Sequence, residues 1–458
     1  MENDTIAAIA TGMSRSGIGK IRMSGSQALE IADRVYRSPG GKKKLVNAES
    51  HTIHYGFIYD GDLLIDEVIV LIMKAPRSYT KEDTVEIDCH GGVVVMQKIL
   101  ETVIKYGARP AEPGEFTKRA FLNGRIDLSE AEAVIDVINA QNEYALSSSI
   151  RQLKGSVSDQ IKKIRASILE DVAFIEAAID DPEHISTDGF ASTLKEHVES
   201  EIVDLQKLLD SANQGKFIKE GIQTVILGKP NVGKSSLLNI LVGEERAIVT
   251  EIPGTTRDTL EESINLHGIP LNIIDTAGIR KTQDVVEKIG VEKAVQVAQK
   301  ADLILYMVDS SLSLDENDFE IMHMIQDKKV IVLLNKTDLE SITTKKMIEE
   351  YVSYPVIEIS AKYGKGIDEL ESLIRDLFFN GRISFNDEVY ITNVRHKTAI
   401  QEAVESLKLV LDSIQQGLPE DFYSIDLMDA YAKLGEIIGE AVGEDLVDKI
   451  FSDFCMGK

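Results

Sequence analysis

The stretch Gly-Lys-Pro-Asn-Val-Gly-Lys-Ser at residues 228–235 constrains the fold of this chain more than any other feature. Its spacing is that of a phosphate-binding loop, in which glycines let backbone N–H groups curl around a phosphate at the start of a helix. Such a loop follows a strand and opens a helix, and the apolar residues 224–227 and the run 236–241 meet both requirements. The sequence therefore predicts a doubly wound α/β domain in which Lys234 reaches the β- and γ-phosphates and Ser235 ligates Mg²⁺.

Three further motifs follow in order, each directly after an apolar run: Asp-Thr-Ala-Gly at 275–278, Asn-Lys-Thr-Asp at 335–338 and Ser-Ala-Lys at 360–362. Ligands of doubly wound sheets bind where the strands end. A carboxylate at Asp338 can accept hydrogen bonds from N1–H and the 2-amino group of guanine, whereas adenine lacks both donors at that edge. The chain is thus expected to bind GTP. The predicted GTP-binding residues are Asn231, Gly233, Lys234, Ser235, Ser236, Thr250, Thr255, Thr256, Asp275, Gly278, Asn335, Lys336, Asp338, Ser360, Ala361 and Lys362.

The composition is that of an ordinary globular chain of 458 residues, with 43% hydrophobic and 28% charged residues. This length favours two to four domains. No apolar run has the length of a membrane span, and the Met-Glu-Asn-Asp start carries no basic signal region. Cys89 and Cys455 imply no disulfide framework. These observations predict a cytoplasmic protein without a membrane partner.

The formal net charge is −26, so the overall field does not attract nucleic acid. Any contact with RNA requires a local basic patch or a partner protein. The small candidates are Lys42 to Lys44 and the group Lys162, Lys163 and Arg165. Ordinary solvated charge is the alternative interpretation of both groups.

Periodicity divides the chain into four segments. Residues 1–120 combine predicted strands at 66–73 and 83–88 with a helix at 93–104, which indicates an α+β domain. Residues 121–216 and 381–458 carry apolar residues at helical spacing, with a break at Asp181-Pro182, and residues 217–380 form the nucleotide domain. We expect the nucleotide domain to be inserted into one helical body made of both helical segments. Two separate helical domains are the alternative.

The position after Asp-Thr-Ala-Gly bears on hydrolysis. Many GTPases place a glutamine there to orient the attacking water, but this chain has Ile279. The catalytic group must therefore come from elsewhere. Arg257, Arg280 and a bound monovalent cation remain alternatives for the transition-state charge, and the loop 280–290 offers Asp284 and Glu287. Thr256 is the candidate Mg²⁺ ligand of the first switch, residues 250–258.

These motifs resemble those of translation-factor-related GTPases that carry a hydrophobic residue in place of the glutamine. Three further segments, at 88–92, 112–124 and 454–458, are similar to the MnmE (TrmE) family of tRNA modification GTPases, and the likeness covers essentially the whole chain. The family usually has Ile where Met456 stands. The resemblance implies a multidomain α/β protein: an N-terminal α+β folate-binding-like domain, an all-α central domain and an inserted P-loop GTPase domain.

The resemblance also implies site residues. A K⁺ ion acting like an arginine finger would be held by Asn231, Thr250, Ile252 and Thr255. Glu287 matches the catalytic glutamate, with Lys234 and Arg257 as further catalytic candidates. The positions that bind a tetrahydrofolate derivative, 5-formyl- or 5,10-methylene-tetrahydrofolate, are Arg22, Glu82, Arg125 and Lys458; at Arg125 the family can have a lysine. Cys455 either assists one-carbon chemistry or fills space as a small apolar residue.

The function that the resemblance implies is a potassium-dependent GTPase. As a homodimer formed by the N-terminal domain, it would act with an FAD-containing MnmG-like partner in a heterotetramer, FAD entering only through that partner. Together they would modify the wobble uridine of certain tRNAs to 5-carboxymethylaminomethyl- or aminomethyl-uridine with a folate one-carbon unit. The alternatives are a regulatory GTPase, for instance in ribosome assembly, without one-carbon chemistry, and a nucleotide-binding scaffold without turnover.

Overall fold

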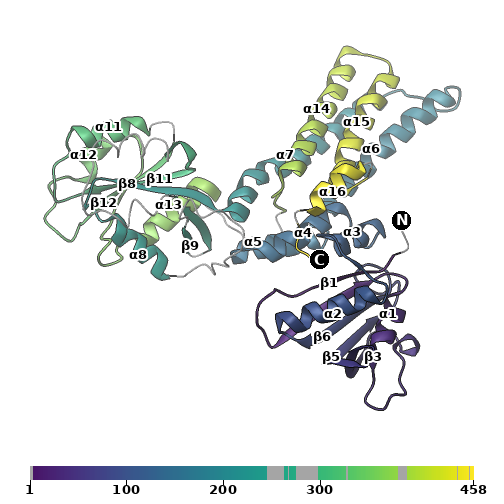
Figure 1. Ribbon diagram of the computed structural model, residues 1–458. Helices are drawn as coiled ribbons and strands as arrows, with labels where there is room; N and C mark the ends of the chain where they lie inside the picture. The colour runs from purple at the N-terminus through teal and green to yellow at the C-terminus, as the bar shows by residue number, and fades with distance from the viewer. Residues whose placement is uncertain are drawn as a thin grey trace. The chain divides into compact units, whose positions relative to one another are not determined.

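A computed structural model describes residues 4–244, 262–266, 268–274, 298–325, 328–379, 389–440, 442–452 and 454–457 (Figure 1). The chain divides into two compact units, each built from separated segments. The first unit comprises Met1–Ile135, Gln152–Thr187 and Gln415–Lys458, and the second comprises Asp136–Arg151 and Asp188–Ile414. The domain boundaries that the sequence suggests, at 120, 216 and 380, remain predictions.

The first unit contains a seven-stranded sheet in the order β3-β4-β5-β6-β2-β1-β7. Its pairs are antiparallel except for β1 with β7. Helices α1 and α2 pack on one face, where Ile21, Val70 and Ile87 are buried. The elements are β1 (Ile6–Ile9), β2 (Ile18–Ser24), α1 (Ala28–Val35), β3 (Tyr36–Arg37), η1 (Leu45–Asn47), β4 (Thr52–Asp60), β5 (Leu63–Met73), β6 (Thr84–His90), α2 (Val93–Lys105) and β7 (Arg109–Pro110). The predicted α+β character of this region is confirmed.

The second unit contains a six-stranded sheet in the order β13-β12-β11-β8-β10-β9. All its pairs are parallel except β9 with β10. One apolar cluster joins the sheet to α8 and α13, and another joins it to α11 and α12, so both faces are covered, as the doubly wound prediction requires. The elements are β8 (Ile222–Gly228), α8 (Lys234–Glu244), β9 (Glu262–Leu266), β10 (Ile269–Ile273), β11 (Leu303–Asp309), α11 (Glu316–Met324), β12 (Lys329–Asn335), α12 (Lys345–Glu349), β13 (Val356–Glu358) and α13 (Ile367–Phe379).

The remaining described elements are helices, as the loss of strand signal predicted. They are α3 (Glu115–Leu122), α4 (Leu128–Asn139), α5 (Glu143–Leu153), α6 (Ser156–Asp180), α7 (Phe190–Glu220), α14 (Val394–Gln416), α15 (Glu420–Ile438) and α16 (Glu444–Ser452). The stripe of α6 from Val157 to Ile175 is buried, and α6 packs along α15 within the first unit (Figure 1). Helix α6 ends at Asp180, because the residue before Pro182 is disfavoured in helical conformation.

The segment 454–457 packs back onto the start of the chain within the first unit. Phe454 is buried in a cluster with Leu128 and Phe451. Gly457 has φ +86°, and a Cβ there would lie 2.5 Å from the carbonyl oxygen of Ile9. Only glycine can approach β1 this closely in a left-handed backbone conformation. The final described residues are therefore part of the N-terminal fold.

No helix among the described residues is both long enough and apolar enough to cross a membrane.

Candidate functional site

The phosphate loop lies where the sequence predicts it, between the end of β8 and the start of α8. Gly228 has φ +147° and a Cβ there would come 2.6 Å from the carbonyl oxygen of Met307. Gly233 has φ +109° and a Cβ there would come 2.3 Å from Nδ2 of Asn335. Both positions therefore require glycine for backbone conformation and for space. Asn231 adopts φ 62° between them, a left-handed conformation that asparagine tolerates.

Lys234 is half-buried at the first residue of α8. Its ammonium donates hydrogen bonds to the carbonyl oxygens of Gly228, at 2.6 Å, and Lys229, at 2.7 Å. Burial lowers the pKa of Lys234 because the charged form loses solvation. The ammonium of Lys234 and the N-terminus of α8 together provide positive charge that favours binding of a polyphosphate.

Asn335 joins the phosphate loop to the Ser-Ala-Lys loop. Its side chain, 2% exposed, lies at the end of β12. Nδ2 donates to the carbonyl oxygen of Val232 at 2.7 Å, and Oδ1 accepts from the backbone N–H of Ala361 at 2.9 Å. The predicted nucleotide residue thus also fixes the distance between two loops that are far apart in sequence.

Asp338 is exposed, and its Oδ1 accepts a hydrogen bond from Oγ of Ser360 at 2.7 Å. Lys336 has φ 65° and its ammonium pairs with Asp309 at 2.5 Å. The Lys362 ammonium lies 5.0 Å from the ring centroid of Tyr363. Ser360 therefore orients the carboxylate of the exposed Asp338, which keeps acceptor capacity for a ligand.

Lys229 is a residue that sequence reasoning did not single out. Its ammonium pairs with Asp315 at 2.7 Å and with Asp318 at 2.5 Å, at the capping box that opens α11. Tyr306 donates to Asp318 at 2.8 Å, and burial together with that carboxylate raises the pKa of the Tyr306 hydroxyl. This network attaches the phosphate loop to a neighbouring helix. The Asp-x-x-Asp spacing of the cap is the signal that would have indicated it.

Several predicted residues lie outside the part of the chain that the structure describes. They are Thr250, Ile252, Thr255, Thr256, Arg257, Asp275, Gly278, Ile279, Arg280, Asp284, Glu287 and Lys458.

A second candidate site lies in the first unit, around the ring of Tyr79. The guanidinium carbons of Arg22 and Arg125 lie 5.8 Å and 4.6 Å from the Tyr79 ring centroid. Arg22 also lies 5.6 Å from the ring centroid of Phe116 and donates to the carbonyl oxygen of Gly457 at 3.1 Å. The structure therefore brings two of the predicted folate residues together around an aromatic ring. Sequence reasoning missed Tyr79 itself, because nothing in its local pattern distinguishes it from a core tyrosine.

Glu82, a third predicted folate residue, contacts the same region. Its carboxylate accepts from Oγ of Ser24 at 2.7 Å and from Nη1 of Arg119 at 3.2 Å. Neighbouring Glu86 is buried, which favours its neutral form, but Lys20 and Arg22 outweigh that effect and lower its pKa. Two of the cations here are thus held by carboxylates, Arg22 by Glu86 and Arg119 by Glu82.

Two sequence interpretations need correction. Arg165 was grouped with Lys162 and Lys163 as a surface charge, but it is 6% exposed, because its guanidinium pairs with Glu440 and donates to the carbonyl oxygen of Tyr431. Cys455 is exposed, so its interpretation as an apolar filler is wrong. Its carbonyl oxygen accepts from the backbone N–H of Gly114.

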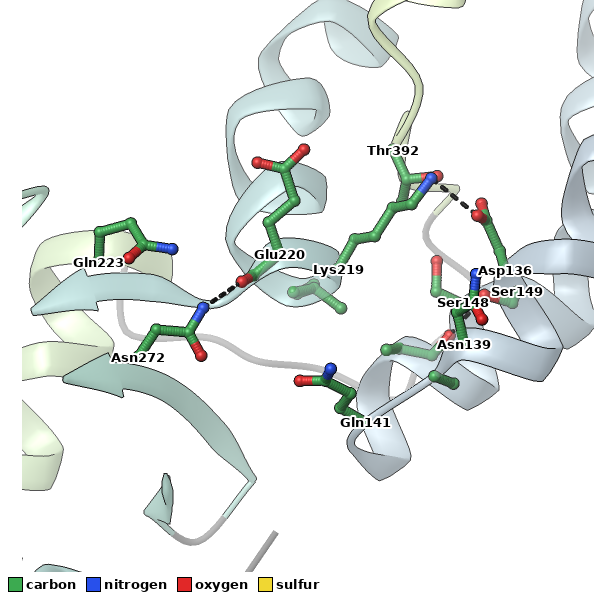
Figure 2. A pocket seen from close by; sticks show the side chains of 13 residues that line it. Asp136, Asn139, Gln141, Ser148, Ser149, Lys219, Glu220, Gln223, Asn272 and Thr392 are labelled. Atoms are coloured by element: carbon green, nitrogen blue, oxygen red, sulfur yellow. Dashed lines mark hydrogen bonds and ion pairs between the residues drawn. The ribbon is translucent and has the colours of Figure 1, made fainter. Parts of the chain in front are cut away.

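A polar pocket of about 500 Å³ lies at the start of β8, at the other end of this strand from the phosphate loop (Figure 2). Lys219 pairs with Asp136 at 2.7 Å on one wall. Asn272 donates to the carbonyl oxygen of Glu220 at 2.6 Å on another. None of the predicted nucleotide residues that the structure describes lines this pocket, which separates it from the site above.

Comparisons with known proteins cover the whole chain. A family model described as "GTP-binding protein TrmE N-terminus" matches residues 5–125, and one described as "MnmE helical domain" matches residues 128–455. A protein of Lachnoclostridium phytofermentans described as tRNA modification GTPase MnmE is 58% identical over 458 residues, covering 100% of both chains. A protein of Acetivibrio thermocellus with the same description is 50% identical over 463 residues, again covering 100% of both.

A solved structure of the G domain of the T. maritima FeoB iron transporter is 25% identical. It covers 34% of this chain and 97% of its own, with a TM-score of 0.26. With a score this low, the likeness carries no weight for fold or function.

Proposed function

The chain belongs to the MnmE family of tRNA modification GTPases, and from that premise we propose that it hydrolyses GTP to drive modification of the wobble uridine of certain tRNAs. The observation that carries the proposal is the junction at Asn335, which binds the Val232 carbonyl on one side and the Ala361 N–H on the other. This junction supports the proposal because it joins the phosphate loop to the Ser-Ala-Lys loop, whose Ser360 binds Asp338, the residue we propose for guanine recognition.

The nucleotide part of the proposal rests on donors and acceptors that the structure describes. Lys234 donates to two backbone carbonyls that a phosphate can replace, and Ser235 follows it in the first turn of α8. This set fits a triphosphate with Mg²⁺, for which Ser235 supplies a hydroxyl oxygen. Bound Mg²⁺ would neutralise phosphate charge, while Lys234 and the helix N-terminus orient the phosphates.

Guanine selection is tested by Asp338→Asn. The amide keeps an oxygen that can accept from Ser360 but presents an N–H₂ donor toward the base. Guanine offers donors there, whereas xanthine offers a carbonyl at the 2-position. We expect affinity for GTP to fall at least about tenfold and affinity for XTP to rise, measured by nucleotide binding to the full chain. Asp368→Asn, at an exposed carboxylate on α13 of the same domain, is the matched control. Unchanged preference for GTP would contradict the assignment.

For the hydrolytic step, we propose that K⁺ serves where other GTPases use an arginine. The proposal is supported by the apolar Ile279 at the usual glutamine position and by Asn231, which the structure holds at φ 62° in the phosphate loop. Glu287 then orients the attacking water, with Thr250, Ile252 and Thr255 as further K⁺ ligands. Equal turnover in KCl and NaCl at equal ionic strength would exclude this proposal.

For the first unit, we propose a site for a reduced folate around Tyr79. Arg22 and Arg125 approach its ring from within 6 Å, and such cation–aromatic groups suit a flat heterocycle with an anionic glutamyl tail. Glu82 supplies a carboxylate that can read the amino-amide edge of a pterin. Lys458 follows Gly457, whose carbonyl Arg22 already binds, and the exposed Cys455 lies two residues before Gly457.

The folate proposal is tested with 5-formyl-tetrahydrofolate and the full chain. Arg125→Met removes the cation nearest Tyr79 but keeps a chain of similar length. We expect its dissociation constant to rise roughly tenfold, because a partly desolvated cation contact contributes about 1–2 kcal/mol. Arg34→Met, at an exposed arginine of α1, is the control. Absence of any binding by the wild-type chain would instead favour the regulatory GTPase without one-carbon chemistry.

A homodimer is supported by the outer face of β4 and β5. Ile53 is 68% exposed, Tyr55 51% and Ile69 46%. Cross-strand pairing puts Ile53 opposite Leu71 and Tyr55 opposite Ile69, so these four side chains form one apolar surface. We call it the β4–β5 face. A contiguous apolar sheet face of this kind suits a second copy of the chain.

The remaining parts of the proposal follow from the family. An FAD-containing partner of the MnmG kind would complete a heterotetramer and share the one-carbon and redox chemistry, in the cytoplasm where both GTP and tRNA are found. The modified base would be 5-carboxymethylaminomethyl- or aminomethyl-uridine. Mass analysis of wobble uridines from cells lacking the protein tests this directly, since an unchanged set of modified uridines would exclude it.

A further inference from the structure

A basic segment interrupts the acidic chain at the end of α1. Residues 34–44 contain Arg34, Arg37, Lys42, Lys43 and Lys44 and no Asp or Glu, in a protein with a net charge of −26. All five side chains are exposed. We call residues 34–44 the basic segment. Three of these cations pair with carboxylates: Arg34 with Glu30, Arg37 with Asp62 and Lys44 with Asp33. The local positive field therefore comes mainly from Lys42 and Lys43.

The structure folds the basic segment around a pocket of about 370 Å³ beside the edge of β4. Lys42, Lys43 and His54 line it, together with the backbone turn at Ser38 and Pro39. Ile53 and Tyr55 also line it, so the pocket adjoins the β4–β5 face. Tyr36 closes one side by donating to the carbonyl oxygen of Tyr55 at 2.6 Å. The pocket is therefore a concave surface with cations on its rim.

The loop that carries the lysines is anchored at both ends. Near its start, Oγ of Ser38 accepts from the backbone N–H of Lys43 at 3.2 Å. At its end, Asp33 accepts from the backbone N–H of Leu45 at 2.6 Å and lies 3.8 Å from the ammonium of Lys44. Asp33 thus pairs with Lys44, whereas Lys42 and Lys43 line the pocket.

The charges of Lys42 and Lys43 are not neutralised locally. Within the described residues, neither ammonium forms an ion pair, whereas Lys44 does. The pKa of His54 is lowered, first by burial and then by the positive charge of Lys43. Two cations that face a pocket without a carboxylate partner suit an anionic ligand.

We propose that Lys42, Lys43 and the pocket beside β4 bind the phosphodiester backbone of the RNA substrate. The inference rests on the proposed function, because it assumes that the protein acts on tRNA. A polyanion fits better than a single small anion, because Lys42 and Lys43 are exposed on the rim of the pocket rather than buried inside it. Such a contact would position the RNA without recognising its sequence, because ammonium groups bind phosphate charge and do not distinguish bases.

The test compares two double variants of the full chain that lower the net charge equally. Lys42→Gln/Lys43→Gln removes both pocket cations, and Lys345→Gln/Lys346→Gln removes two adjacent lysines of α12 in the nucleotide domain. Binding of purified tRNA is measured against NaCl concentration. Each phosphate contact that is lost should lower the salt slope by about one and the affinity near 0.1 M salt by roughly eightfold. We expect this change for the first variant and none for the second.

Four outcomes would overturn the inference. One is an unchanged affinity and salt slope for Lys42→Gln/Lys43→Gln. Another is equal loss in both variants, which would mean a general charge effect. The third is loss of binding to an acidic protein partner with RNA binding kept. Inorganic phosphate serves as a competitor, and effective competition at millimolar concentration would assign the pocket to a free anion.

Failure of this inference is distinguishable from failure of the proposed function. If cells that carry only Lys42→Gln/Lys43→Gln keep fully modified wobble uridines while cells lacking the protein do not, the function stands and the RNA site is wrong. GTP turnover of the variant, which should equal that of the wild type, checks that the chain is folded.

Discussion

Among single residues, Arg165 shows how a charge becomes structural. Its guanidinium carbon lies 3.9 Å from the ring centroid of Tyr431, and its nitrogens bind the Tyr431 carbonyl at 3.2 Å and Glu440 at 2.6 Å. Gly435 leaves room for it, because a Cβ there would lie 3.1 Å from Nη2. Arg165 therefore links α6 to α15 and to the residues that follow it.

Replacing this arginine should destabilise the first unit. Arg165→Met keeps much of the apolar stem but removes every polar contact. We expect the free energy of unfolding to fall by about 1–3 kcal/mol, measured by urea denaturation. Arg34→Met, with a side chain that is 55% exposed, should change stability little.

The same pair gives a pH dependence. The Arg165 hydrogen bond and charge hold the pKa of Glu440 below its usual value, despite partial burial. A carboxyl with a lowered folded-state pKa contributes stability above its unfolded pKa and loses it as pH falls through the folded value. The stability difference between wild type and Arg165→Met should therefore shrink below about pH 4.3. A difference that stays constant down to acid pH would contradict this origin.

Asn335 shows which features of a single residue can be predicted from the sequence and which cannot. Its motif predicted a nucleotide contact, and the spacing of four motifs placed it at the end of a strand. The hydrogen bonds to Val232 and Ala361 were not predictable, because they join segments that are 103 and 26 residues away. The burial of Arg165 could not be predicted for the same reason, because its hydrogen-bond partners lie 266 and 275 residues away in the sequence.

Among the elements, the β4–β5 face carries a testable consequence. Ile69→Glu would place a carboxylate at the centre of this face, opposite Tyr55. If two copies pair there, burying that charge is costly, so the variant should be monomeric in sedimentation at concentrations where the wild type is a dimer. Leu312→Glu is the control, since Leu312 is 59% exposed on the nucleotide domain. A dimeric Ile69→Glu chain would place the interface elsewhere.

Elements were the most predictable scale. Residues 66–73, 83–88 and 93–104 were expected as two strands and a helix, and the structure has β5, β6 and α2 there. The two-residue strands β3 and β7 were not expected, because so short a segment carries no periodicity. They exist through pairing with β4 and β1, which is a tertiary effect.

At the scale of the whole molecule, the chain passes between its two units several times. Residues 136–151 leave the first unit to pack with the second, where Ala145 joins the apolar core beneath β8 and β10. The sequence predicted that the nucleotide domain is an insertion. A change in composition could not predict that 16 residues before it, 136–151, belong to the second unit. Ala145 and Tyr144 pack against residues of the second unit that come much later in the sequence, so their contacts could not be predicted from local pattern.

The return of Gly457 to Arg22 and Ile9 has a consequence for biosynthesis. Arg22 is bound by a residue that is translated 435 positions later, a delay on the order of 20–90 s at ordinary elongation rates. The sheet of the second unit, which ends with β13 at Glu358, leaves the ribosome earlier. A nascent chain should therefore complete the sheet of the nucleotide domain before the Gly457 carbonyl can bind Arg22 beside Tyr79. A chain that ends before Gly457 should therefore bind GTP while Arg22 lacks its contact with the Gly457 carbonyl.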